Sequence, residues 1–309
     1  MRLIHFTLKE YLSAHPNILN RPHSTIAEIC LTYLNSQEVN ALTVDSYSDT
    51  IEKGNSFLRY CSLHWGVHVK MELSDCAKSL SLELLSEYNG HISGKIIFSK
   101  LQLRIMCIPT DYQFSGLHCA SLFGIVEVVA ALIEMECCGI NEEDRMGYTP
   151  LTWAARNGHE EVVKILLERE EVNPNKPDIY GHPPLSYAAG FGHEGVVKIL
   201  LGREEVDPDK PGNDGRTPLA HASNYGEEGV VKILLRREEV NPDKPDEDGR
   251  TPLSHAAQYG YKGVVKILLE CEEVNPDKPD NNGRTPLSHA AKGGREGVAG
   301  FSMVRPVWS

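Results

Sequence analysis

The sequence predicts an all-α solenoid that follows a separate helical segment, and three observations carry this prediction. A Thr-Pro-Leu or Pro-Pro-Leu triplet recurs at a constant step of 34 residues, beginning at positions 149, 183, 217, 251 and 285. The first four triplets are each followed by a Val-Val-Lys-Ile-Leu-Leu segment, and then by a stretch that contains two prolines. A period of about 20 to 50 residues is typical of stacked units that bury a core only against their neighbours.

Residues 1–110 lack the repeat and form the first predicted part of the chain. Pro16, Pro22 and the polar stretch 43–55 predict breaks between its elements. Ser24 is a suitable N-cap for one helix. The apolar spacing predicts one strand followed by four helices, at 2–6, 7–14, 24–34, 57–69 and 74–88.

Each repeated unit begins with a short capped helix, which the copy at Thr251 illustrates. The Thr251 hydroxyl can accept a backbone N–H of the first turn, and Pro252 at the first helical position loses no needed hydrogen bond. Ala256 and Ala257 are small enough for a neighbouring helix to approach closely. Gly260 is suited to end the helix.

The rest of the unit predicts a buried second helix and a connecting loop. Residues 264–269 are apolar around most of a helix, so they must lie between neighbours. Residues 273–283 contain two prolines and many turn formers, which predicts a finger-like loop. A weaker copy begins at Ser115, so we expect about six repeats over 111–298, the last one incomplete. We expect an irregular tail at 299–309 and fraying over 285–309.

The charge is unevenly distributed along the chain. Residues 1–110 carry 10 Lys+Arg and 10 Asp+Glu out of totals of 31 and 43, so the whole net charge of −12 lies in residues 111–309. An acidic array disfavours nucleic acid and anionic membrane as partners, because both are bound through cationic side chains. The chain shows no secretory signal, and none of its eight cysteines forms a C-x-x-C pair. We expect a cytoplasmic protein.

Motifs for catalysis or cofactor binding are not supported. The segment 90–96 is one residue short of a phosphate-binding loop and ends in Ile where Ser or Thr is needed. His221, His255 and His289 recur once per repeat, but stacked helices lie too far apart for one zinc ion, so we interpret them as a semi-exposed stacking column. No calcium loop and no nucleophile can be nominated. We therefore expect no enzyme activity, no cofactor and no metal.

The pattern T-P-L-x-x-A-A-x-x-G followed by V-V-K-I-L-L resembles the ankyrin repeat. The resemblance implies an ankyrin solenoid whose function is protein binding. The period exceeds the usual 33 residues by one. The His that normally follows T-P-L is kept only at His118, whereas the later repeats carry Thr152, Ser186, Ala220, Ser254 and Ser288. A different hydrogen-bonding link between successive fingers is therefore expected.

The opening Arg2-Leu3-Ile4-His5-Phe6-Thr7-Leu8-Lys9-Glu10-Tyr11-Leu12, together with Tyr60-Cys61-Ser62-Leu63-His64-Trp65, resembles the segment after the nucleotide-binding module of fungal NACHT-ankyrin proteins, which are NOD-like-receptor relatives. The resemblance implies a winged-helix remnant and spacer over 1–110, a ligand-sensing array after it, and a possible upstream nucleotide-binding module. A general ankyrin adaptor or inhibitor scaffold is the alternative. A fragment of a signalling NTPase that lacks its P-loop module here is the enzyme-class alternative.

Residues that differ between near-identical repeats predict the binding surface for a protein of unknown identity. Tyr187 and Phe191, like His221 and Tyr225, are four apart and share one helix face. They predict an aromatic stripe beside an arginine column on the concave face, of the kind that dominates protein interfaces. Alternatively, the stripe only packs on the next finger and the arginines pair with nearby acids. The predicted binding residues are Arg145, Met146, Tyr148, Trp153, Arg156, Asn157, Tyr180, His182, Tyr187, Phe191, Asp214, Arg216, His221, Asn224, Tyr225, Asp248, Arg250, His255, Gln258, Tyr259, Arg284 and His289.

Overall fold

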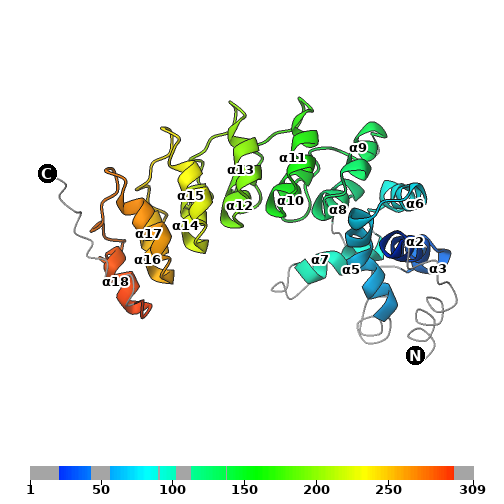
Figure 1. The fold of residues 1–309 in the computed structure, drawn as a ribbon, viewed down its shortest axis with the longest axis horizontal. Coiled ribbons are helices and arrows are strands. Elements are labelled where there is room, and N and C mark those ends of the chain that lie inside the picture. Colours follow the sequence, from blue (N-terminus) through cyan, green and yellow to red (C-terminus); the bar gives the residue numbers. More distant parts are fainter. Residues whose placement is uncertain (1–20, 43–55, 90, 102–112, 137, 296–309) are drawn as a thin grey trace. The chain divides into compact units, whose positions relative to one another are not determined.

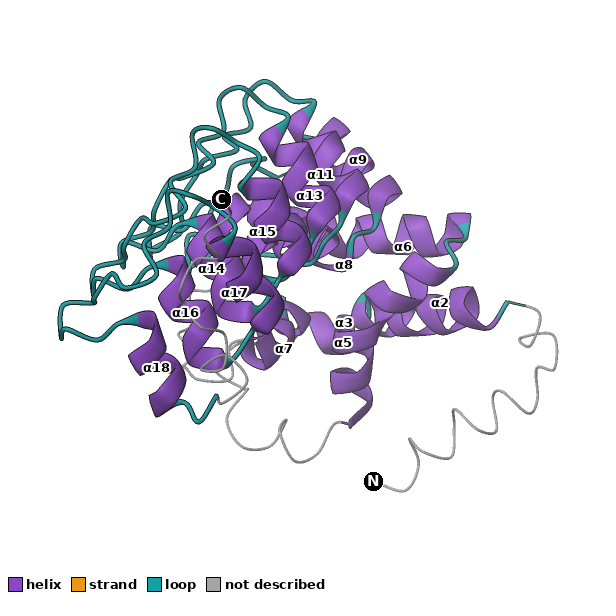
Figure 2. Cartoon of the chain, turned by 60° about the vertical axis from the view of Figure 1, so that its left-hand side comes forward, coloured by secondary structure: helices purple, strands orange, loops and turns teal. Residues whose placement is uncertain are grey.

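The structure, a computed structural model, describes residues 21–42, 56–89, 91–101, 113–136 and 138–295. These residues form sixteen helices and no strand (Figures 1 and 2), which confirms the predicted all-α class. None of the described helices combines the length and the apolar character needed to cross a bilayer. The chain divides into two compact units, Met1–Arg145 and Met146–Ser309, and each is described by itself.

The first unit has its core where α5 packs against α2, α7 and α8. The Trp65 side chain of α5 is completely buried, and its ring meets the Phe123 ring of α8 edge to face at 5.3 Å. The helices of this unit are α2 (Pro22–Leu34), α3 (Gln37–Asn40), α5 (Ser56–Met71), α6 (Asp75–Ser86), α7 (Ile92–Leu101), α8 (Gly116–Phe123) and α9 (Val126–Glu134).

The sequence predicted three of these helices. Helices α5 and α6 confirm the predictions at 57–69 and 74–88, and the Ser74 hydroxyl accepts the Ala77 N–H at 3.0 Å as an N-cap. Helix α2 confirms the predicted helix at 24–34 and the break at Pro22, where it begins, but the cap at Ser24 was wrong because Ser24 lies inside the helix. A proline in the first helical turn lacks only an N–H that has no partner there. Helices α3 and α7 were not predicted, and the predictions at 2–6, 7–14 and 43–55 lie outside the described residues.

The second unit stacks helix pairs in two rows. The first helices contact one another along the stack, as do the second helices, and the long loops gather on one side (Figures 1 and 2). The first helices are α10 (Pro150–Arg156), α12 (Pro184–Gly190), α14 (Pro218–Tyr225), α16 (Pro252–Tyr259) and α18 (Pro286–Lys292). The second helices are α11 (Glu160–Leu167), α13 (Glu194–Leu201), α15 (Glu228–Leu234) and α17 (Lys262–Leu269).

The predicted caps and breaks explain why the first helices are short. The hydroxyls of Thr149, Thr217 and Thr251 accept the N–H three residues further on, at 3.2 to 3.3 Å. Gly260 follows α16 with φ of 82°, in the left-handed region that glycine adopts at low cost. In the third repeat Pro183 replaces the threonine, so α12 begins without a side-chain cap.

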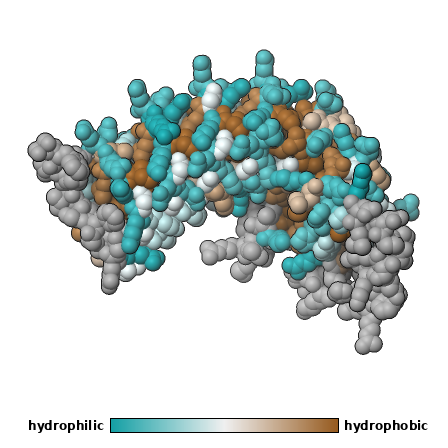
Figure 3. Space-filling view, in the orientation of Figure 1, coloured by the Kyte–Doolittle hydropathy of each residue, from teal (hydrophilic) through white to brown (hydrophobic). Residues whose placement is uncertain are grey.

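The second helices bury most of their apolar surface, as predicted. Val264, Val265 and Leu268 of α17 are completely buried, whereas Ile267 on the same helix is half-buried. Figure 3 shows a broken band of apolar residues over the helix pairs, with hydrophilic residues along it. Burial between neighbouring pairs is therefore the main source of stability of the array.

The ends of the array add two observations. Helices α8 and α9 of the weak first repeat pack on α6 within the first unit, so the predicted boundary at 110 remains a prediction. Helix α18 forms against α16, so the fraying expected from residue 285 does not include this helix. Residues 296–309, with the predicted tail, lie outside the described part of the chain.

Candidate functional site

A buried carboxylate organises the finger turn in the third, fifth and sixth repeats. Asp246 Oδ1 accepts the N–H groups of Asp248 and Arg250 at 3.0 and 2.8 Å. Asp178 and Asp280 accept the equivalent N–H groups at 2.8 to 2.9 Å. These turns are therefore fixed before any partner binds, and so are the positions of the side chains at their tips.

Successive fingers are joined by backbone hydrogen bonds. The Asn213 N–H donates to the Tyr180 carbonyl at 2.7 Å, and the Glu247 N–H donates to the Asp214 carbonyl at 3.0 Å. Lysines add a second link, because Lys244 Nζ donates to both the carbonyl and a carboxylate oxygen of Asp209 at 2.9 Å. Lys278 makes the same pair of contacts with Asp243 at 2.7 and 3.0 Å.

We call these contacts of Lys244 and Lys278 the lysine ladder. They join successive fingers without a histidine, whereas the sequence predicted a different link but not the residues that form it. In the first unit, His118 Nε2 lies 3.0 Å from the Glu142 carbonyl, while its Nδ1 accepts the Ser115 N–H. In the second, third, fifth and sixth repeats a short hydroxyl replaces this histidine, and in the fourth repeat Ala220 does. The Ser254 and Thr251 hydroxyls, for example, lie 3.2 Å apart within one turn and do not reach another finger.

The column that contains the three repeated histidines is mostly buried. Trp153 is 0%, His255 1% and His289 4% exposed, so the prediction of a semi-exposed column was wrong for them. The reason is the buried carboxylate: His255 Nε2 contacts Asp246 Oδ2 at 2.9 Å, and His289 Nε2 contacts Asp280 Oδ2 at 2.9 Å. The two histidines therefore support the finger turns from behind.

This arrangement shifts the pKa values of the buried groups. Burial alone would raise the pKa of the Asp246 carboxyl, but hydrogen bonds from His255 and from the Arg250 N–H hold that pKa below its usual value. In the third repeat the hydroxyl of Tyr187 donates to Asp178 in place of a histidine. Burial, together with the neighbouring Tyr148 and Asp178, raises the pKa of Tyr187, so this phenol stays protonated.

One row of aromatic side chains is exposed at the ends of the first helices. Phe191, Tyr225 and Tyr259 are 51%, 57% and 43% exposed, and the rings of Phe191 and Tyr225 lie nearly parallel with centroids 6.4 Å apart. We call the surface formed by this row and the neighbouring finger turns of the second unit the first-helix face. Tyr180, 50% exposed, lies at the tip of the third-repeat finger.

The predicted arginine column is largely neutralised. Arg216 lies 3.5 Å from Asp214 and 3.7 Å from Asp246, and Arg250 lies 3.5 Å from Asp248. For these two side chains the alternative of pairing with nearby acids describes the structure. Arg284 is exposed at the equivalent place, and its backbone N–H donates to Asp280 at 2.9 Å.

A cavity of about 230 Å³ opens on the first-helix face between the second, third and fourth repeats. Arg156 is its central cation: the guanidinium lies 5.3 to 5.9 Å from the centroids of four aromatic rings. The Arg156 Nη1 group also lies 3.5 Å from the Tyr148 hydroxyl. The lining residues are Tyr148, Arg156, His182, Ser186, Tyr187, Gly190, Phe191, His221 and Tyr225.

Seven of the nine lining residues had been predicted as binding residues, whereas Ser186 and Gly190 had not. Sequence reasoning selected large and charged side chains, so it missed a glycine that provides space and a small hydroxyl. Departure from the repeat pattern is the signal that could have found Gly190, because the other repeats carry larger side chains there. Burial lowers the pKa of His221 to about 3, with the adjacent His182 acting in the same direction, so His221 is neutral near pH 7.

The other predicted binding residues differ in accessibility. Met146 and Tyr148 are buried at 8% and 6% exposure, so they contribute little surface. The Asn157 amide donates to the Trp153 carbonyl at 2.8 Å and closes the end of α10. Asn224 and Gln258 are half-buried, and Arg145 is exposed but belongs to the first unit.

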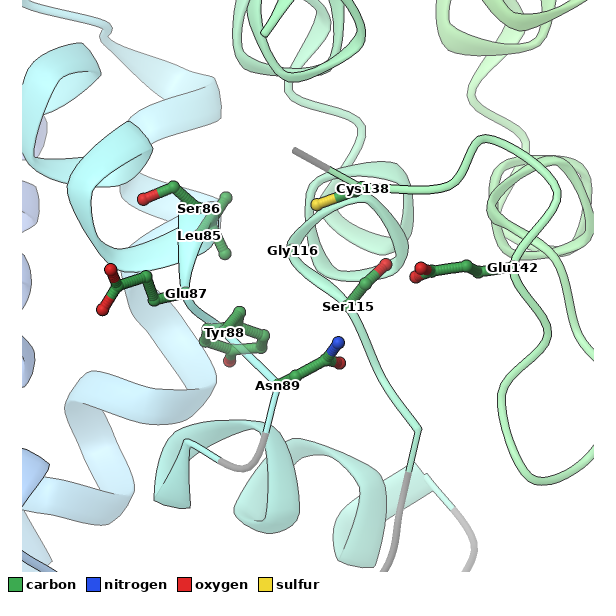
Figure 4. Close-up of a pocket in the computed structure, with 9 residues that line it drawn as sticks. All are labelled: Leu85, Ser86, Glu87, Tyr88, Asn89, Ser115, Gly116, Cys138 and Glu142. Carbon is green, nitrogen blue, oxygen red and sulfur yellow. The ribbon is translucent and has the colours of Figure 1, made fainter. Parts of the chain in front are cut away.

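The first unit contains a separate cavity of about 350 Å³ between α6, α8 and the loop that follows α9. Asn89, Ser115 and Glu142 point toward one another across it, whereas Ser86 and Glu87 point away (Figure 4). No predicted binding residue lines this cavity. It presents an uncharged amide and one carboxylate on a turn, which defines no specific ligand.

Stacked helix pairs, hydrogen-bonded fingers and one continuous face of first helices define a helical repeat protein that presents a long preformed surface. The family model for ankyrin repeats matches residues 93–178, 170–246 and 229–301, and the chain belongs to the ankyrin-repeat family. Ankyrin repeats are generally non-catalytic and bind other proteins, so the chain carries a protein-protein interaction module. No curated protein matches the chain.

Proposed function

We propose that the chain binds its partner protein through the first-helix face of the second unit. The observation that carries this proposal is the exposed row of Phe191, Tyr225 and Tyr259 beside the cavity that holds Arg156. Tyrosine and arginine supply much of the binding energy in protein interfaces. Large apolar rings in contact with water release free energy when a partner covers them.

The rigidity of the face supports the same proposal. Phe191 and Tyr259 stand at the ends of short helices whose preceding turns are fixed by the buried carboxylates of Asp178 and Asp246. Backbone hydrogen bonds and the lysine ladder hold neighbouring fingers in register. A surface that is already ordered binds at a smaller cost in conformational entropy.

The predicted residues have different roles in this proposal. Trp153, His255 and His289 support the face from inside, because they are almost completely buried. The accessible or half-buried residues supply the contacts. We propose as contact residues Arg156, Tyr180, His182, Tyr187, Phe191, Asp214, Arg216, His221, Asn224, Tyr225, Asp248, Arg250, Gln258, Tyr259 and Arg284.

The test compares the full chain with a triple variant, Phe191→Ala, Tyr225→Ala and Tyr259→Ala. Each immobilised protein captures partners from a cell extract, and quantitative mass spectrometry compares the captured proteins. The captured amount of each wild-type partner is expected to be at least about tenfold lower on the variant. Truncating a central aromatic side chain typically costs about 2 kcal/mol or more of binding free energy. Unchanged capture would show that another surface binds.

A matched control removes exposed apolar side chains elsewhere. Val67→Ala and Met71→Ala change residues of α5 in the first unit that are 48% and 65% exposed. This double variant should capture the same partners as the wild-type chain. The melting temperatures of all variants should be close, because none of these side chains is buried.

The finer assignment is a ligand-sensing array of a NOD-like-receptor type of protein. It is supported by the resemblance of residues 2–12 and 60–65 to fungal NACHT-ankyrin proteins, of which only 60–65, within α5, belong to the described residues. A cytoplasmic location fits the free thiols of the described cysteines. A full transcript that lacks an upstream G-x-x-x-x-G-K-[ST] motif would instead favour a general adaptor or inhibitor scaffold.

A further inference from the structure

Three departures from the repeat pattern meet at the cavity on the first-helix face. Gly190 occupies the position of Arg156, Asn224, Gln258 and Lys292 in the other repeats. Gly212 occupies the position of Asp178, Asp246 and Asp280, and Pro183 the position of Thr149, Thr217, Thr251 and Thr285. In the other repeats, the residues at these positions complete the regular structure. Where all three are replaced together, a local site forms that the other repeats lack.

Gly190 opens the cavity. A Cβ atom at this position would lie 3.5 Å from the Tyr225 ring and 3.6 Å from His221 Cβ, which are ordinary contact distances. A methyl group therefore fits there without displacing its neighbours. Its absence leaves the space between Phe191, His221 and Tyr225 unfilled.

Gly212 leaves room for the His182 imidazole, which lines the cavity. A Cβ atom at Gly212 would lie 2.1 Å from His182 Nδ1, so the His182 ring occupies the place of the missing side chain. Without a carboxylate at position 212, His221 has no acid partner of the kind that His255 has. The His182 and His221 rings instead meet edge to face, with centroids 4.6 Å apart and Nδ1 to Nε2 at 3.4 Å.

Pro183 leaves the hydroxyl of Ser186 without a partner. In the second, fifth and sixth repeats the equivalent hydroxyl lies 3.1 to 3.2 Å from that of the N-cap threonine. Proline has no hydroxyl, and the Ser186 Oγ atom is buried and makes no hydrogen bond within the described part of the chain. A buried hydroxyl that lines a cavity without a bond favours a polar group from a ligand.

Arg156 supplies the charge. Its guanidinium is half-buried among aromatic rings. Within the described part of the chain, its one hydrogen bond is the long contact to the Tyr148 hydroxyl, and it forms no ion pair with a carboxylate. Arg216 and Arg250, by contrast, each have an acidic neighbour. A half-buried guanidinium without a counter-ion is a strong site for a carboxylate, which it can bind through two parallel hydrogen bonds.

We propose that this cavity binds a single acidic side chain, Glu or Asp, of a peptide segment of the partner protein, with apolar neighbours of that residue packing on Phe191 and Tyr225. This proposal rests on the proposed function of the first-helix face. A single carboxylate is favoured over an acidic run because the second unit, which holds Arg156, has 20 Lys+Arg and 26 Asp+Glu over residues 146–309 and therefore a net charge of −6. The negative potential of this unit repels a polyanion. For a single carboxylate, the attraction to the guanidinium is larger than this repulsion.

The experiment selects ligands from a displayed library of random peptides of about 12 residues, using the full chain as the target. Enriched peptides should share one Glu or Asp with apolar or aromatic neighbours. A synthetic peptide of this type is then compared with its Glu→Gln or Asp→Asn form by isothermal titration calorimetry. The acidic form should bind the wild-type chain at least about tenfold more tightly, as expected for one charge-assisted hydrogen-bonded pair.

Two variants of the chain test the assigned residues. On Arg156→Met the difference between the acidic and amide peptides should fall below about twofold, because the guanidinium that distinguishes them is gone. Arg236→Met, which removes an exposed arginine after α15, is the matched control and should keep the full difference. Gly190→Gln should weaken binding of the acidic peptide at least about tenfold by filling the cavity.

Several results would overturn the carboxylate site. In the library selection, these results are the enrichment of no peptides, of peptides without an acidic residue, or of acidic runs. In calorimetry, they are tighter binding of a peptide in which phosphoserine replaces the acidic residue, and an unchanged preference of Arg156→Met for the acidic peptide. The triple variant of Phe191, Tyr225 and Tyr259 separates the two proposals. Loss of peptide binding on that variant, with no effect of Arg156→Met, rejects only the carboxylate site. Unchanged peptide binding on the triple variant rejects the face itself.

Discussion

The fourth and fifth repeats have the same arrangement of helices, but the histidine of the first helix lies in different surroundings in each. In the fifth repeat, His255 is buried against Asp246, and that carboxylate also holds the finger turn. In the fourth repeat, Gly212 stands in place of the aspartate, and His221 lines a cavity beside His182. The comparison teaches that a histidine repeated at one position can be a structural element in one repeat and part of a candidate binding site in the next.

The largest effect is expected from breaking the regular repeat. Asp246→Ala removes the acceptor for two turn N–H groups and leaves His255, which is 1% exposed, without its partner. Removing one member of a buried pair should destabilise the fold by about 3 kcal/mol, measured by urea denaturation followed by circular dichroism. The control Asp248→Ala removes an exposed partner of Arg250 and should cost less than about 0.5 kcal/mol. Equal losses for both variants would contradict the structural role of Asp246.

An intermediate effect is expected from the pH dependence of the fourth repeat. The pKa of His221 is about 3 in the folded chain because of burial, and that of an unfolded histidine is about 6.5. Between these values the unfolded chain binds a proton that the folded chain does not, so stability falls as the pH is lowered through this range. Between about pH 7 and pH 5, the wild-type chain should lose about 1 to 2 kcal/mol more stability than His221→Gln. Parallel pH profiles of the two proteins would show that His221 is not buried in its neutral form.

The smallest effect is expected from making the third repeat more regular. Gly190→Ala adds a Cβ atom at ordinary contact distance in a helix, so it should raise the unfolding free energy by about 0.5 to 1 kcal/mol. Thermal unfolding measures the gain. Gly212→Ala is the informative partner variant, because its Cβ atom would collide with His182 and should lower stability. A loss of stability in Gly190→Ala would mean that the space beside Tyr225 is already filled.

Local hydrogen bonding explains how much of the fold could be predicted. The Thr-Pro-Leu start and the glycine stop predicted the first helices correctly, because caps involve groups within four residues of each other. The same reasoning failed at Ser24, which was expected to cap a helix that begins two residues earlier, at Pro22. It also gave no signal for α3 and α7 in the part of the chain without repeats.

The candidate site could be predicted only in part. Exposed aromatics such as Tyr225 and Tyr259 were recognised because they vary between repeats and share a helix face. Burial of His255 could not be predicted, because its partner Asp246 lies in a turn whose side chain the periodicity does not orient. The lysine ladder was likewise not identified in advance, since Lys244 and Asp209 belong to different repeats.

The sequence by itself determined the helix pairs, their caps and the finger loops, because each depends on residues close together in the chain. Only the tertiary structure decided which histidines are buried and that Arg156 has no counter-ion among the described residues. It also decided that the space beside Gly190 is open. These properties depend on side chains from neighbouring repeats, and their contacts are set by how closely the helix pairs stack.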